Sequence, residues 1–224
     1  MIAITKALAL VGLTGHVIDV EADVGNGVPT FNLLGLPDAA LSEARDRVRS
    51  AIINSGANWP NKRITLALSP AALPKRGSAF DCAIALALLG AAEELSIERL
   101  AGALILGELT LDGRIKAIPG VLASLRAAAL QGITSAVLPS ENVHEGALVS
   151  GVEIFHFSHL RELLAWCNGG EYLPTKSELI DLVDPSHGAV DFSDISGQER
   201  AKEALEIGAV GGHHLAMVGP PGVG

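Results

Sequence analysis

The residues with the clearest chemistry close the sequence, in the run Gly219-Pro220-Pro221-Gly222-Val223-Gly224. This run matches the opening of the phosphate-binding pattern G-x-x-x-x-G-K-[ST], in which the lysine reaches the β- and γ-phosphates and the hydroxyl residue holds Mg²⁺. Residues 214–218 are mostly apolar and predict a short buried strand before the glycines. Backbone N–H groups at such a strand-to-loop junction can turn toward an anion. We therefore expect a partial nucleotide-binding loop that stops before the lysine and the Mg²⁺ ligand.

A second group with chemical potential is the loop around Ser78, which precedes a strongly apolar segment. Ser78 could act as a nucleophile with Lys75 or Lys116 as its base. A serine at a loop–helix junction is more often a cap, and Ser78 and Asp81 have capping-box spacing, so we interpret Ser78 as a cap. Lys75 and Arg76 could hold an anion or nucleic acid near the helix N-terminus, or simply be solvated.

Three arginines follow one another at alternate positions in a predicted helix, at Arg45, Arg47 and Arg49. We expect them on the solvent side, with Arg45 and Arg49 on one face and with Glu43 paired to Arg47 at i,i+4. They could form a DNA-contacting stripe or an ordinary solvated face.

The remaining candidate ligands do not predict a metal site. His144, His156 and His159 lack metal-ligand spacing with cysteines or carboxylates. Cys82 and Cys167 both lie in apolar helical contexts, which favours reduced core thiols over a disulfide framework.

Composition places the chain among packed globular proteins, since 49% of its 224 residues are hydrophobic. A net charge of −9 argues against a generally basic nucleic-acid surface but leaves room for a local basic patch. The N-terminus has no basic region of the secretory type, and the longest apolar run, residues 83–92, is about half of a membrane span. We expect a soluble cytoplasmic protein.

The elements that must position these groups follow from hydrophobic periodicity and turn residues. Strands are expected at 4–24 (two, around a turn at 12–15), 30–34, 63–68, 104–111, 114–118, 136–138 and 152–157. Helices are expected after the caps Asp38 and Ser158, at 79–92, at 120–131 and briefly after Ser140. The pattern predicts an α+β or mixed α/β domain over residues 1–167. A loosely charged, Gly- and Pro-containing stretch at 168–190 predicts a linker, and a new unit with a helix at 198–210 occupies 191–224.

Several segments carry a family resemblance across essentially the whole chain. The segments Asp194-Ile195-Ser196-Gly197-Gln198 and Gly211-Gly212-His213-His214, with the glycine-rich run, resemble the start of a magnesium-chelatase-related AAA+ ATPase. Residues 31–38, 68–71 and 75–81 resemble the domain that precedes this module in the ComM/YifB family.

That preceding domain is similar to the proteolytic domain of Lon, with its ribosomal-protein-S5-domain-2-like fold, on the basis of residues 107–115, 118–120 and 137–142. Lon uses a serine nucleophile and an activating lysine. The resemblance places these two positions at Ala79 and Leu122, so both members of the dyad are absent and the resemblance implies a catalytically dead domain.

For the full-length protein, the resemblance implies a ring-forming, hexameric motor that uses ATP and Mg²⁺ to drive branch migration on single-stranded or branched DNA during natural transformation. The present chain would then be a non-catalytic module for assembly or DNA engagement, with no cofactor of its own and no membrane partner. Two alternatives stay open: a motor subunit that inserts Mg²⁺ into a tetrapyrrole, and an active Ser–Lys peptidase.

Overall fold

The computed structural model describes residues 1–12, 14–35, 37–171 and 191–220. The chain divides into two compact units, residues 1–179 and 180–224, and each is described by itself. The division falls within the stretch expected to be a linker, most of which lies outside the described residues. Among the described residues, no helix is both long enough and apolar enough to span a membrane.

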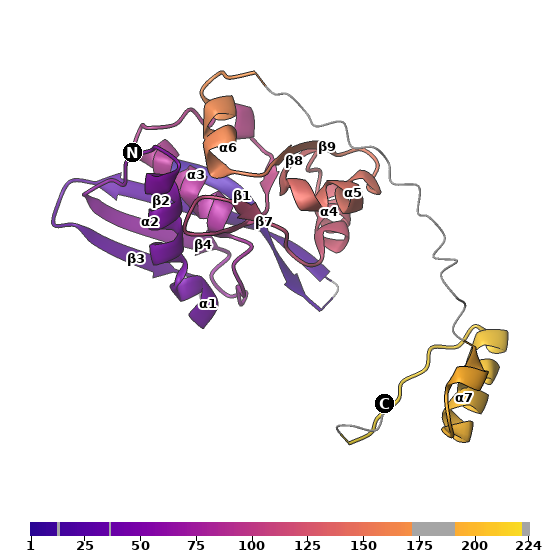
Figure 1. Ribbon diagram of the computed structural model, residues 1–224. Helices are drawn as coiled ribbons and strands as arrows, with labels where there is room; N and C mark the ends of the chain where they lie inside the picture. The colour runs from indigo at the N-terminus through magenta and orange to yellow at the C-terminus, as the bar shows by residue number, and fades with distance from the viewer. Residues whose placement is uncertain (13, 36, 172–190, 221–224) are drawn as a thin grey trace. The chain divides into compact units, whose positions relative to one another are not determined.

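The first unit is built on a mixed sheet with the strand order β3-β4-β2-β1-β5-β8-β9 (Figure 1). The strands are β1 (Ile2–Val11), β2 (Thr14–Gly25), β3 (Thr30–Leu34), β4 (Arg63–Ser69), β5 (Leu104–Ile105), β8 (Ser135–Pro139) and β9 (Glu153–Phe157). The pairs β1–β2 and β2–β4 are antiparallel, and the other four pairs are parallel. The predicted mixed α/β class is therefore confirmed.

Alternate residues of β1 contribute to two different cores, because successive side chains of a strand point to opposite faces. Ala7 and Ala9 belong to the larger core, whereas Leu8 belongs to the smaller one. The β1–β2 hairpin itself was expected, and its register runs from Ile2 opposite Asp23 to Val11 opposite Thr14. Two layers of helices can therefore pack on one ribbon.

The larger core is centred on α3 (Asp81–Ala91), every residue of which is buried. A helix that is apolar all round has to be covered on every side. β1 and β2 lie against α3 from the sheet, and α2 (Ala44–Asn54) packs beside it. The short helix α1 (Ala39–Ser42) precedes α2 and has Asp38 as its N-cap, as expected. The single helix expected after Asp38 is thus two helices, separated at Glu43.

The smaller core lies between α4 (Val121–Leu130), α5 (Val143–Ala147) and the strands β5 and β8. Leu125 and Ala128 of α4 are fully buried there, which agrees with the helix predicted at 120–131. Three short 3₁₀ segments complete the described elements: η1 (Glu98–Leu100), η2 (Ser140–Asn142) and η3 (Phe192–Asp194).

The long strand expected at 104–111 is interrupted. Gly107 has φ +154°, and the chain leaves β5 there to form a separate antiparallel pair, β6 (Glu108–Leu109) with β7 (Ile115–Lys116). A side chain at this position would meet Cys82 and Ile115 at 2.9 and 2.8 Å, so the kink needs a glycine. The kink matters for the site because it turns Glu108 out of the main sheet.

The last helix of the first unit, α6 (Leu160–Cys167), has a different cap from the one expected. His159, not Ser158, is the N-cap, and it forms a capping box with Glu162. Any acceptor side chain can fill this role if its backbone is extended, and His159 has φ −143°. Trp166 of α6 then packs against Phe155 and Phe157 of β9, with ring centroids 4.8 and 5.5 Å apart.

The second unit contains one long helix, α7 (Glu199–Gly211), in agreement with the predicted helix. The strand expected at 214–218 is not formed, and Met217 and Val218 are exposed. A strand requires a hydrogen-bonded neighbour, and the described part of this unit offers no other strand to pair with it.

Candidate functional site

The two positions at which the sequence resemblance expects the Lon dyad, Ala79 and Leu122, carry side chains without reactive groups. Ala79 is partly buried in the loop before α3 and lines a pocket of about 240 Å³. Leu122 lies in the first turn of α4 and packs against the smaller core. Neither side chain has a hydroxyl or amine, so this pair can neither attack a carbonyl nor activate a nucleophile.

The pocket beside Ala79 is mixed in character. Leu8, Leu10, Leu106 and Ile118 form its apolar wall. Its polar lining is contributed by Arg76, Ser78, Glu108 and Ser124. A mixed, half-open pocket of this kind is a place where a ligand can sit, but it has no nucleophile–base pair of the Lon type.

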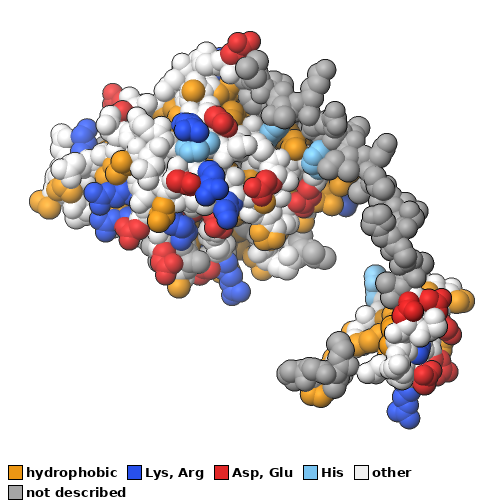
Figure 2. Space-filling view, viewed as in Figure 1, with side chains coloured by type: hydrophobic (Ala, Val, Ile, Leu, Met, Phe, Trp, Pro, Cys, Tyr) orange, Lys and Arg blue, Asp and Glu red, His pale blue; other side chains and the backbone are white. Residues whose placement is uncertain are grey.

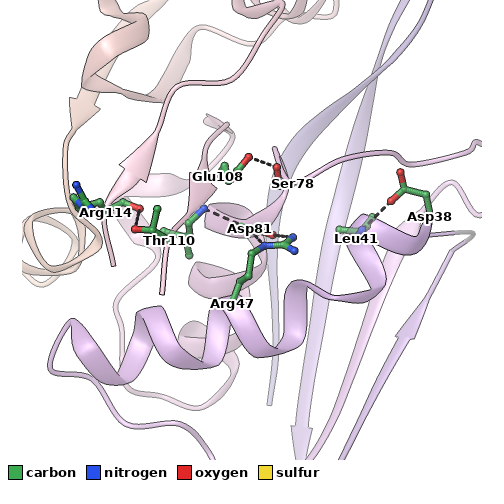
Figure 3. Close-up of polar contacts among 9 residues, drawn as sticks. Asp38, Leu41, Arg47, Ser78, Asp81, Glu108, Thr110 and Arg114 are labelled. Atoms are coloured by element: carbon green, nitrogen blue, oxygen red, sulfur yellow. Dashed lines mark hydrogen bonds and ion pairs between the residues drawn. The ribbon is translucent and has the colours of Figure 1, made fainter. Parts of the chain in front are cut away.

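Ser78 does not cap α3, so the capping prediction was wrong. The helix begins at Asp81 with Phe80 as its N-cap residue and without a side-chain cap. The Ser78 hydroxyl instead donates to the Glu108 carboxylate, which the kink at Gly107 brings to the pocket (Figure 3). Ser78 is therefore held by a carboxylate from β6 rather than by the amide groups of its own helix.

Neither Lys75 nor Lys116, the two lysines expected as possible bases, is hydrogen-bonded to the Ser78 hydroxyl. Lys75 is fully buried, and its Nζ donates to the carbonyl of Pro70. Lys116 is exposed on β7, as the register partner of Glu108, and forms no ion pair among the described residues. A relocated Ser–Lys dyad is not assembled at this loop.

Lys75 and Arg76 were expected to be two exposed cations, but Lys75 is buried. Desolvation lowers the pKa of its amine, and its side chain cannot reach a ligand from where it lies. Arg76 is exposed and lines the pocket, so contact with an anion stays a prediction for Arg76.

Asp38 joins this loop to α1, and Figure 3 shows its contact with Leu41. One carboxylate oxygen accepts from the Leu41 N–H at 2.8 Å, and the other accepts from the Gly77 N–H at 3.0 Å. The Asp38 N–H also donates to the carbonyl of Lys75 at 3.1 Å. Two of these hydrogen bonds join Asp38 to the loop that leads to Ala79, and the third caps α1.

A bidentate ion pair with a fully buried carboxylate was not predicted. Arg47 was expected in solvent beside Glu43, but it makes a bidentate ion pair with Asp81, at 2.9 Å from Nε and 3.0 Å from Nη2. Asp81 also accepts from the Leu109 N–H at 3.3 Å. Burial raises the pKa of Asp81 to about 6, and the hydrogen bonds and charge of Arg47 partly offset this. A lone aspartate in an otherwise apolar helix was the available signal for such a partner.

Arg45 and Arg49 are exposed on one face of α2, as expected. The Arg45 guanidinium lies 5.9 Å from the centre of the Phe31 ring on β3. The structure separates them from Arg47, so the three arginines do not form a common stripe.

Of the partial phosphate loop, only Gly219 and Pro220 are described, and both are exposed. Pro221, Gly222, Val223 and Gly224 lie outside the described residues. No group of three or more metal-ligating side chains occurs in the described part of the chain.

The mixed sheet with the fully buried helix α3 defines an α/β domain, which a second compact unit follows in the chain. A family model described as subunit ChlI of Mg-chelatase matches residues 20–142, and a second, for magnesium chelatase subunit ChlI, matches residues 191–224. The chain belongs to the magnesium-chelatase-like family that includes ComM and YifB.

Curated relatives agree with this assignment. An uncharacterized protein of Mycobacterium tuberculosis is 45% identical over 97% of this chain and 43% of its own length. Competence protein ComM of Haemophilus influenzae is 37% identical over 100% of this chain and 44% of its own length. The chain thus spans less than half the length of these relatives. Lon protease of Mycolicibacterium smegmatis is 30% identical over 62% of this chain and 18% of its own length, which supports the Lon-like domain.

Proposed function

We propose that this chain is the N-terminal part of a ComM-type AAA+ ATPase, and that its first 167 residues are a non-catalytic module for assembly or DNA engagement. The observation that carries the proposal is the pairing of a retained Lon-like loop with two inert dyad positions. Asp38 still fixes the loop conformation, yet Ala79 and Leu122 supply no nucleophile and no base. A domain that keeps the Lon-like fold but has no nucleophile and no base at these positions is suited to binding rather than to catalysis.

For the full-length protein, we propose an ATP-driven, hexameric motor that acts on single-stranded or branched DNA. The sequence at 219–224 supports nucleotide binding, with ATP and Mg²⁺ as cofactors of the complete loop. In this proposal hydrolysis requires the lysine that follows the glycines in the pattern.

Peptidase activity can be tested separately with a fluorophosphonate probe, which labels activated serines. We expect no stoichiometric labelling of the 224-residue chain, because no lysine amine of the described residues is hydrogen-bonded to the Ser78 hydroxyl, which donates to Glu108 instead. Stoichiometric labelling at Ser78 that is lost in Ser78→Ala would contradict the non-catalytic assignment.

The motor assignment is tested by the ATPase rate of the full-length protein with and without DNA. We expect single-stranded or branched DNA to stimulate hydrolysis. A second candidate is a magnesium-chelatase motor, which the description of both family models favours. Stimulation by a chelatase partner complex, with none by DNA, would establish that alternative instead.

A further inference from the structure

A shallow hollow of about 90 Å³ lies between α2, β3 and the loop that leads into β4. We call it the basic hollow, and its functional lining is Phe31, Arg45, Arg49, Trp59, Asn61 and Lys62. It is separate from the pocket beside Ala79, with which it shares no lining residue.

The charge of the basic hollow is opposite to that of the chain. The sequence carries 25 acidic and 16 basic residues, yet the hollow is lined by Arg45, Arg49 and Lys62 and by no carboxylate. All three cations are exposed, and none enters an ion pair among the described residues. Figure 2 shows Lys and Arg side chains on the side of this unit where Figure 1 places β3. Cations that are close together and not neutralised favour a polyanion.

Two aromatic side chains, Phe31 and Trp59, line the basic hollow together with these cations. The rings of Phe31 and Trp59 lie 6.1 Å apart with an interplanar angle of 30°, and the Arg45 guanidinium lies over Phe31. Both rings are partly exposed. Aromatic rings and guanidinium planes are the groups on which unpaired nucleobases stack. In a duplex the base faces are already stacked on one another, so such a surface favours a single strand.

The backbone adds further donors. β3 is the end strand of the sheet and pairs only with β4 among the described strands, so its other edge presents backbone groups outward. The exposed side chains of Thr30 and Asn61 lie at the same hollow. These groups can bond to phosphate or base-edge atoms, as in other single-strand sites.

We propose that the basic hollow binds single-stranded DNA, with phosphates on Arg45, Arg49 and Lys62 and bases against the Phe31–Trp59 pair. The proposal rests on the DNA-motor function above, and it names the surface by which the N-terminal unit would hold the strand. Phe31 and Trp59 also pack on the larger core, so the cations are the groups to replace.

The test is binding of a fluorescent oligothymidylate to the 224-residue chain, followed by anisotropy at several salt concentrations. We expect Arg45→Ala/Arg49→Ala/Lys62→Ala to bind at least tenfold more weakly than the wild type. Loss of three phosphate contacts should also reduce the slope of log affinity against log salt by about 2. The control Arg126→Ala/Arg161→Ala/Lys116→Ala removes three exposed cations from other elements and should change affinity less than twofold.

Wild-type affinity in the triple variant, or no binding by the wild type, would overturn the proposal. Equal affinity for a duplex of the same length, or equal competition by polyglutamate, would overturn the assignment to single strands. The motor hypothesis fails by a different result, namely a full-length ATPase that no DNA stimulates. If DNA stimulates the ATPase of the wild type and of the triple variant equally, the DNA-motor function is supported. The basic hollow is then excluded as the DNA-binding site.

Discussion

The carboxylate of Asp81, fully buried at the start of α3, is held by both Nε and Nη2 of Arg47 from α2 (Figure 3). The same carboxylate accepts from the backbone of Leu109 in β6. One side chain therefore connects α2, α3 and the strand that carries Glu108 to the pocket. The loop at Ser78 lies between two anchored points, the Asp81–Arg47 ion pair at the start of α3 and the hydrogen bond from the Gly77 N–H to Asp38.

Replacing Arg47 by methionine should destabilise the first unit by about 3 kcal/mol at pH 7.5, because it leaves the Asp81 carboxylate buried without its counter-ion. Urea unfolding followed by circular dichroism measures the loss. The control is Arg49→Met on the same helix, where the exposed side chain should cost less than about 0.5 kcal/mol. Equal losses in the two variants would show that the ion pair does not carry this stability.

Stability should depend on pH through Asp81. The pKa of Asp81 in the folded protein is about 6, against ~3.9 for an aspartate in an unfolded chain. The folded state binds the proton more tightly, so this stabilisation is complete below about pH 4 and is lost as pH rises through about 6. A shift of roughly 2 units corresponds to about 3 kcal/mol. Urea unfolding between pH 4 and 7 should show this decline in the wild type, and Asp81→Asn should lack it. Parallel pH profiles for the two proteins would contradict the assignment.

Gly107→Ala should be strongly destabilising. A methyl group there would lie 2.8 Å from Ile115 and 2.9 Å from Cys82, and the backbone has φ +154°. We expect a loss of about 3 kcal/mol from clash and strain together. Gly132→Ala is the matched control, since its φ is +83° but nothing lies within 4 Å of the added methyl. Thermal unfolding compares them, and a larger loss in the control would refute the steric argument.

The two thiols should react slowly in the folded chain. Burial raises the pKa of Cys167 to about 12 and raises that of Cys82 well above its ordinary value. Since the thiolate is the reactive form, Ellman's reagent at pH 8 should modify both only as the chain unfolds. Immediate modification of either thiol without urea, measured at 412 nm, would show that it is accessible.

Local patterns predicted much of this fold. Hydrophobic periodicity predicted a helix after Asp38, and Val48, Ala51 and Ile52 form the buried side of α2. The strand alternation in β2 and the cap at Asp38 were likewise predicted, because each depends on residues that are neighbours in the chain. The cap predicted at Ser158 was wrong, because the N-cap of α6 is the next residue, His159, whose side chain accepts from the Arg161 N–H.

The partners of charged side chains could not be predicted in this way. Lys75 looked like a solvated loop residue and is buried against the carbonyl of Pro70. Arg47 looked paired to its helical neighbour and reaches Asp81, which is 34 residues away. A long charged side chain pairs with a group that folding brings within its reach, and sequence spacing does not identify that group.

The sequence alone determined the family and the mixed α/β class, because both depend on residue types at particular positions along the chain. Only the tertiary structure decided that Ser78 binds Glu108, that Asp81 joins three elements, and that Arg45 meets Phe31 and Trp59 at one hollow. Those relationships join segments separated by many residues, and their geometry exists only after the sheet and helices have packed.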